Sequence, residues 1–83
     1  MKYSTVIEQG PSNYSAYVPD LPGCVSTGRT LDEVTANIRA AIELHLEGLR
    51  EEGAPIPEPR TIVKEIESSG QPVRISAPRA IRE

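Results

Sequence analysis

Two side chains in this sequence have the chemistry of a nucleophile and its general base, the thiol of Cys24 and the imidazole of His45. Such a pair works only when the base lies within hydrogen-bond reach of the thiol and helps to form the thiolate. Cys24 falls in a short β-branched segment, whereas His45 falls near the middle of the apolar stripe of a later helical segment. A half-buried thiol in a strand is usually inert, and a histidine in such a stripe is usually packed against its neighbours. We therefore expect no catalysis by Cys24 and His45.

The carboxylates of this chain are the other groups that could form a site, because they could bind a metal ion. Glu8, Asp20, Asp32 and Glu33 do not follow the spacing of an EF-hand loop or of a His-Glu-x-x-His helix. The sequence also has no glycine-rich phosphate loop, no nucleophile elbow and no aromatic-plus-basic RNA-binding motif. We therefore expect a protein that is not an enzyme and that uses neither a metal nor another cofactor.

The size and composition of the chain favour one small domain with a thin core. The chain has 83 residues, and its three aromatic side chains are all tyrosine. A core built from isoleucine, leucine, valine and alanine in so short a chain leaves little stability margin, which oligomerisation commonly improves. We therefore expect a homodimer or a homotetramer.

The net charge indicates which kind of partner the chain binds, and the cysteine content indicates the cellular compartment in which it works. The formal net charge is −3, and binding to a phosphate backbone depends on clustered lysine and arginine, so a basic partner is favoured over nucleic acid. The single cysteine allows neither an internal disulfide nor a thiolate zinc cluster, and no apolar run approaches the length of a signal peptide or a membrane span. We expect a cytoplasmic protein without membrane contact.

The residues between 17 and 33 must position the elements around them, because they combine two prolines, two glycines and a helix start. Proline fixes φ at about −65° and removes a backbone donor, so the chain must turn here. Asp20 is expected to close a local turn with its side chain, and Gly23 to adopt a positive φ. Thr30 and Glu33 have the spacing of a capping box, which predicts a helix beginning at about Leu31. The predicted turn and cap residues are Pro19, Asp20, Leu21, Pro22, Gly23, Gly28, Thr30 and Glu33.

Alternating β-branched residues predict three short strands before this helix, at residues 2–8, 14–18 and 24–28. From Leu31 to Leu49 an apolar residue at every third or fourth position predicts an amphipathic helix, which ends at Gly53 and the prolines that follow. The outer face of this helix becomes acidic toward its end. Three glutamates spaced four residues apart are the candidate partner-binding residues: Glu43, Glu47 and Glu51.

A further β-branched segment at residues 60–66 follows the helix. A strand after a crossover helix usually lies parallel to a strand already in the sheet, so this segment predicts a fourth strand. The expected fold is α+β in the order β-β-β-α-β, with one four-stranded sheet and a helix on one face. The opposite face must then be solvated or covered by another copy or a partner.

Residues 67–83 form a short polar and basic tail, with three arginines against two glutamates. Val73 and Ile75 alternate with polar residues, a pattern that can add a strand to a neighbouring sheet edge. Its proline, serine and glycine content and its terminal position favour instead a disordered basic arm. The candidate nucleic-acid contacts are Arg74, Arg79 and Arg82, and DNA binding stays an open question at this point.

Three groups of residues follow one another along the chain as Tyr17-Val-Pro-Asp-Leu-Pro-Gly-Cys-Val-x-x-Gly-x-Thr-x-x-Glu33, Asn37-Ile-x-x-Ala-Ile-Glu43 and Glu52-Gly-x-Pro-Ile-Pro-x-Pro59. In this order they resemble the HicB family of antitoxins over residues 1–66, and several rigid positions coincide. The resemblance implies a β-β-β-α-β fold likened to part of ribonuclease H, without its catalytic carboxylates, that assembles as dimers or tetramers.

The resemblance also implies a partner, HicA, a small basic mRNA-cleaving toxin whose active site HicB covers. Many family members add a C-terminal helix-turn-helix or ribbon-helix-helix domain that represses their own operon, and residues 67–83 are too few for either. We therefore predict an antitoxin-like protein with a domain at residues 1–66 that neutralises a HicA-like toxin. Regulation of its own operon stays an open question, because the tail is too short for either DNA-binding domain. The alternative is an orphan self-assembling regulatory or ligand-binding module without a toxin.

Overall fold

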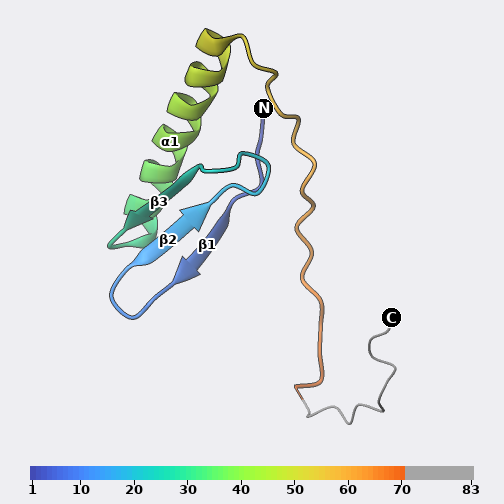
Figure 1. Ribbon diagram of the computed structural model, residues 1–83. Helices are drawn as coiled ribbons and strands as arrows, with labels where there is room; N and C mark the ends of the chain where they lie inside the picture. The colour runs from blue at the N-terminus through green and yellow to red at the C-terminus, as the bar shows by residue number, and fades with distance from the viewer. Residues whose placement is uncertain (71–83) are drawn as a thin grey trace, which may run out of the picture.

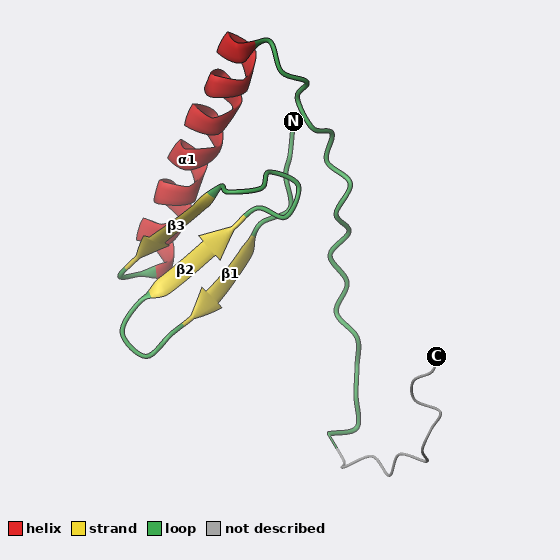
Figure 2. Cartoon of the chain, in the orientation of Figure 1, coloured by secondary structure: helices red, strands yellow, loops and turns green. Residues whose placement is uncertain are grey.

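The computed structural model of the chain describes residues 1–70. Its elements, in chain order, are β1 (Val6–Gln9), β2 (Tyr14–Tyr17), β3 (Val25–Gly28) and α1 (Leu31–Glu52). The strands pair antiparallel in the order β1-β2-β3, and α1 lies across one face of the sheet (Figure 1). A long loop follows the helix and leaves the sheet (Figure 2).

The strand register separates an inner face from an outer face. Ala16 stands opposite Ile7 on β1 and Ser26 on β3, whereas its neighbour Tyr17 stands opposite Val6 and Val25. Successive side chains of a strand point to opposite faces. Ala16 is 2% exposed beneath the helix and Tyr17 is 42% exposed on the outer face. The side chains that face α1 are therefore the ones that build the core.

The core is small and takes one of its central residues from a turn. Leu21 and Val34 are fully buried, one from the turn between β2 and β3 and the other from the first turns of α1. All members of the core are aliphatic or small, as the composition predicts. The buried residues are Ala16, Val18, Leu21, Cys24, Val34, Ile38 and Leu46.

Local capping chemistry sets both ends of α1. The hydroxyl of Thr30, in extended backbone at φ −131°, accepts a hydrogen bond from the Glu33 amide. At the other end Gly53 has φ 72°, and its amide donates to the Arg50 carbonyl while the next amide donates to the Leu49 carbonyl. A glycine in this left-handed conformation satisfies the last carbonyls of a helix. The helix therefore begins at Leu31, as predicted.

The predicted fourth strand is wrong. The described residues form three antiparallel strands followed by the helix, so the β-β-β-α-β order and the four-stranded sheet are not adopted, although the class is still α+β. Thr61 bonds to the segment before β1, where its carbonyl accepts a bond from the Ser4 hydroxyl. Beyond it Ile62 is 86% exposed and the chain runs clear of the sheet (Figure 1). β-branched composition shows that a segment suits a sheet, and it does not supply the backbone ladder.

Gly28 allows β3 to approach the start of α1. A Cβ atom on this residue would lie 2.5 Å from the Val34 nitrogen and 2.7 Å from the Val34 Cα, distances that no side chain can occupy without moving the backbone. The buried strand end and the first turns of the helix are therefore in direct backbone contact. A side chain here would push apart the two elements that carry most of the core.

We expect Gly28→Ala to lower the free energy of unfolding by roughly 1–3 kcal/mol, because the added methyl group overpacks this contact. Urea unfolding followed by circular dichroism measures the change. Gly48→Ala is the matched control, because its added Cβ meets nothing within 4 Å and lies inside α1. Alanine in a helix is more favourable than glycine, so the control should gain about 0.5–1 kcal/mol. Equal stability of the two variants would contradict the close contact.

Candidate partner-binding surface

The turn between β2 and β3 is held by its own backbone. The Leu21 amide donates to the Val18 carbonyl at 3.0 Å, and the Cys24 amide donates to the Leu21 carbonyl at 3.0 Å. Gly23 lies within the turn at φ 85°, a conformation that glycine adopts without strain. These bonds and this backbone direct the Leu21 side chain into the core, which fixes the turn to the rest of the domain.

The carboxylate of Asp20 binds the segment that follows the helix, and not its own turn as the sequence predicted. Its Oδ2 atom accepts hydrogen bonds from the amides of Arg60 and Thr61, both at 3.0 Å, and its Oδ1 atom accepts one from the Thr61 hydroxyl at 3.0 Å. The Thr61 amide, together with the other bonds and the Arg60 charge, holds the pKa of Asp20 below its usual value. We call this set of contacts the Asp20 clamp.

Two bonds from the N-terminal segment complete the attachment of this loop. The Tyr3 hydroxyl donates to the Pro57 carbonyl, and the Ser4 hydroxyl donates to the Thr61 carbonyl at 3.1 Å. The loop after α1 is therefore fixed at residues 57–61 to both the β2–β3 turn and the segment that leads into β1. Neither bond had a sequence signal, because the partners are far apart in the chain.

Glu33 binds one residue further back than a capping box requires. Its Oε1 atom accepts a hydrogen bond from the Arg29 amide at 2.6 Å and lies 3.6 Å from the Arg29 Nε atom. The Arg29 amide, followed by the Arg29 charge, holds the pKa of Glu33 below its usual value. The carboxylate still sits at the positive end of the helix dipole, where a negative charge is favoured.

The predicted partner-binding glutamates Glu43, Glu47 and Glu51 are all exposed along α1. We call them the acidic stripe. At 1.5 Å of rise per residue they span about 12 Å of the helix. Within residues 1–70 the ion pair between Arg29 and Glu33 is the one that the structure forms, so the stripe is not neutralised by a basic side chain of this part of the chain. The three carboxylates are therefore exposed on α1 without an ion pair to a basic side chain of residues 1–70.

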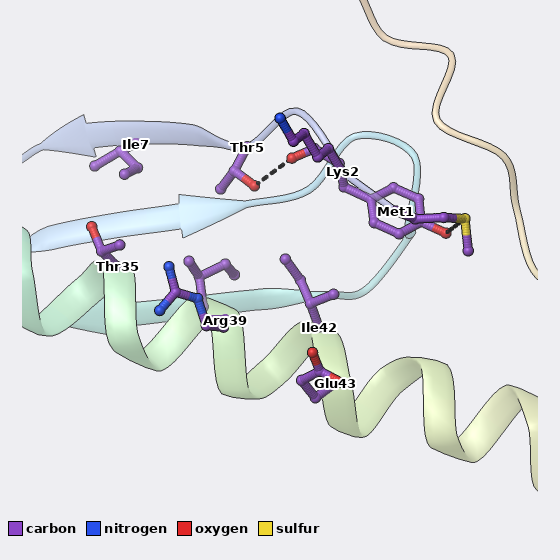
Figure 3. Close-up of a pocket in the computed structure, with 10 residues that line it drawn as sticks. Met1, Lys2, Thr5, Ile7, Thr35, Arg39, Ile42 and Glu43 are labelled. Carbon is purple, nitrogen blue, oxygen red and sulfur yellow. Dashed lines mark hydrogen bonds between the residues drawn. The ribbon is translucent and has the colours of Figure 1, made fainter.

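A groove between β1 and α1 had no signal in the sequence. The helix packs over β2 and β3, so the helix-facing side of β1 is left open. The groove has a volume of about 470 Å³, with Ile7 on the strand side and Ile38 and Ile42 on the helix side. In Figure 3 Arg39 and Ile42 extend from α1 toward Ile7 on β1 and Thr5, which precedes that strand. A three-stranded sheet is wider than one helix, which is the physical reason for the gap.

The two residues with nucleophile and base chemistry do not form a site. Cys24 is buried, and burial raises the pKa of its thiol, which makes a thiolate less accessible. His45 is half-buried on α1, beside the core residue Leu46.

Among residues 1–70 the structure brings no three histidine, cysteine or carboxylate side chains together in a way that could hold a metal ion. In the same range no helix is both long and apolar enough to cross a membrane. Arg74, Arg79 and Arg82 lie outside the described residues.

The meander, the covering helix and the clamped loop define a small α+β domain with an acidic helix. A family model described as the HicB_like antitoxin of bacterial toxin-antitoxin systems matches residues 3–76. The chain belongs to this family, which confirms the resemblance predicted from the sequence.

Relatives of known sequence and structure are consistent with this assignment. The chain is 40% identical over 62 residues to an uncharacterised 14.9 kDa protein of Haemophilus phage HP1, and it spans 47% of that protein's length. It is also 40% identical over 68 residues to a UPF0150 protein of Helicobacter pylori, covering 81% of this chain and 94% of the relative. A solved structure of a HicA3 and HicB3 toxin-antitoxin complex is similar at 32% identity and a TM-score of 0.62, over 71% of this chain and 70% of that one.

We expect Asp20→Asn to loosen the attachment of residues 60 and 61 to the turn, because the amide keeps only one oxygen acceptor and loses the negative charge of the carboxylate. The amide protons of Arg60 and Thr61 should exchange with solvent several-fold faster, as measured by nuclear magnetic resonance. Glu58→Gln is the matched control, because its exposed carboxylate lies in the same loop and outside the clamp.

The same clamp predicts a pH dependence. The folded-state pKa of Asp20 is lowered, so its contribution to stability is present above the usual value of 3.8 and is lost as the pH falls below 3.8 through the folded pKa. The Thr61 amide shift should titrate in that acidic window in the native protein and not in Asp20→Asn. A Thr61 shift that titrates identically in both proteins would rule out the clamp.

Proposed function

We propose that this chain is an antitoxin that binds and neutralises a small, basic, mRNA-cleaving toxin of the HicA type in the cytoplasm. Membership of the HicB_like antitoxin family and the structural similarity to a HicA3 and HicB3 complex support the proposal. The observation that carries it is the acidic stripe, because it offers a surface of the sign that a basic toxin requires.

We propose that the toxin is neutralised because the acidic stripe competes with RNA for the toxin's lysine and arginine side chains. A protein that cleaves mRNA holds the phosphate backbone with lysine and arginine side chains. An acidic stripe that pairs with those side chains both occupies the RNA-binding surface and cancels the field that attracts RNA. The antitoxin then needs no catalytic group of its own. Its binding energy is spent on covering the partner's site.

The rigid attachments within the domain support this role. Gly28 keeps β3 against the first turns of α1, and the C-terminal cap at Gly53 ends the helix two residues after Glu51. The three carboxylates therefore project from one straight element whose orientation is set by the core. A fixed array of charges loses less conformational freedom on binding than a flexible one.

We propose that the domain acts as a homodimer or homotetramer. The outer sheet face supports this, because Tyr17 and Val25 are 42% and 64% exposed and lie side by side with Val6 in one row of the sheet. The row is apolar and the core beneath the sheet is small, so further burial would add stability. The alternative function, an orphan self-assembling module without a toxin, shares this self-association and lacks the toxin partner.

Replacing the acidic stripe tests the proposed function. The partner used is the small basic toxin that this proposal requires, obtained by capture from the host. Glu43→Gln, Glu47→Gln and Glu51→Gln together should weaken its binding by roughly tenfold at low salt, because three exposed charge pairs are lost. The measurement is titration calorimetry together with inhibition of RNA cleavage by that protein.

The control carries the same change in net charge at other exposed positions, Glu8→Gln, Asp32→Asn and Glu58→Gln. It should bind and inhibit as the unmodified protein does. Unchanged binding after loss of the stripe would refute this docking surface. If the tagged protein captures no small basic protein from its own host, the antitoxin function is wrong and the orphan module is favoured.

Regulation of its own operon is a separate proposal, and it depends on the three arginines of the tail, Arg74, Arg79 and Arg82. The acidic body repels DNA, so operator binding should require residues 67–83 and should weaken steeply with salt. A gel shift on the operon's own promoter compares the full chain with residues 1–66. Equal binding by both, or binding by neither, removes the tail from an operator role.

A further inference from the structure

The chain presents two unpaired surfaces that complement each other. One is the groove between β1 and α1, and the other is residues 62–67 of the loop, which we call the exit segment. We propose that two copies of the chain associate by reciprocal exchange, with the exit segment of each copy in the groove of the other. This inference rests on the self-association proposed above, and its test does not require the toxin.

The groove has an apolar floor and a charged rim. Ile7 is 37% exposed at its open side although it stands on the helix-facing side of the sheet, and Ile42 is only partly buried. Lys2, Arg39 and Glu43 line the same groove, giving its rim two cations and one carboxylate (Figure 3). An occupant must therefore supply aliphatic side chains together with a net negative charge.

The exit segment has this composition. Ile62, Val63 and Ile66 are 86%, 72% and 81% exposed, and they form the largest run of exposed aliphatic side chains in the described part of the chain. Between and after them come one lysine and two glutamates, at 64, 65 and 67. The segment is thus the charge complement of the groove rim. Burial of these three aliphatic side chains at an interface would stabilise the dimer, because it removes apolar area from water.

The Asp20 clamp fixes where the exit segment starts and how it leaves the domain. Thr61 is held by three bonds, one with Ser4 and two with Asp20, and the Arg60 amide adds a fourth bond to Asp20. The chain then runs clear of β1 (Figure 1). The amide of Thr61 is taken by Asp20, so the segment projects from a rigid base into solvent. A projecting segment of this kind reaches a neighbouring molecule, and a two-fold axis makes the contact twice.

Two sets of variants separate the halves of this contact. Ile62→Asn with Ile66→Asn alters the exit segment, and Ile7→Asn alters the groove. Each should weaken self-association by at least roughly tenfold, measured by light scattering and sedimentation, because aliphatic burial is lost. Arg39→Glu is a second groove variant with an exposed side chain, so its fold is not at risk. Leu44→Asn is the control, because Leu44 is 71% exposed on α1 and belongs neither to the groove nor to the outer face, so the variant should self-associate as the native protein does.

Mixing the variants tests exchange itself. An equimolar mixture of the exit-segment variant and a groove variant should form a heterodimer that neither forms alone, because one intact segment then meets one intact groove. Native mass spectrometry resolves the species. No recovery on mixing would show that each segment acts within its own chain and would overturn the proposal.

The remaining outcomes distinguish this inference from the proposed function. Stable dimers in every variant would overturn the exchange and leave self-association through the outer face. A monomeric native protein at about micromolar concentration would overturn both self-association and the exchange. Capture of the basic toxin is measured separately, so its failure would bear on the antitoxin role alone.

Discussion

The carboxylate of Asp20 is the contact on which the layout of this domain depends. It accepts three hydrogen bonds from residues 60 and 61 and so ties the loop after α1 to the β2–β3 turn. The turn in turn places Leu21, one of the two fully buried side chains, at the centre of the core. One side of the turn therefore packs the core while the other side holds the C-terminal loop. Since charge-assisted bonds are stronger than neutral ones, a single carboxylate suffices for this task.

The size of the core explains why so much apolar surface stays outside. One helix packs over β2 and β3 and cannot also cover β1, so the groove stays open. The chain has no phenylalanine or tryptophan to fill it, and Tyr3 lines the groove without closing it. The same limit leaves Tyr17 and Val25 exposed on the outer face. A domain this small gains stability by covering such surfaces with another molecule, which is why its exposed apolar residues carry functional meaning.

The features predicted correctly from the sequence are those that depend on neighbours in the chain. The helix start at Leu31 and the positive φ of Gly23 follow from capping and turn chemistry within a few residues. The prediction of a fourth strand was wrong because a strand must pair with the edge of another strand, and β-branched residues do not specify that edge. The prediction that Asp20 bonds to its own turn was wrong for the same reason, since the donors that it binds lie some forty positions away in the chain. Gly28 was placed among the turn and cap residues, but its close contact with Val34 requires the packed structure.

The two proposed surfaces meet at Glu43, which both begins the acidic stripe and lines the groove. If a lysine of a neighbouring exit segment pairs with this carboxylate, the stripe that remains for a toxin is shorter by one charge. Toxin binding and self-association then compete for one group, and linkage requires each to weaken the other by the same factor. That factor is small, because an exposed pair contributes little. Glu47 and Glu51 lie beyond the groove and stay available in either state, so the coupling adjusts the balance between dimer and toxin complex without preventing the toxin complex from forming.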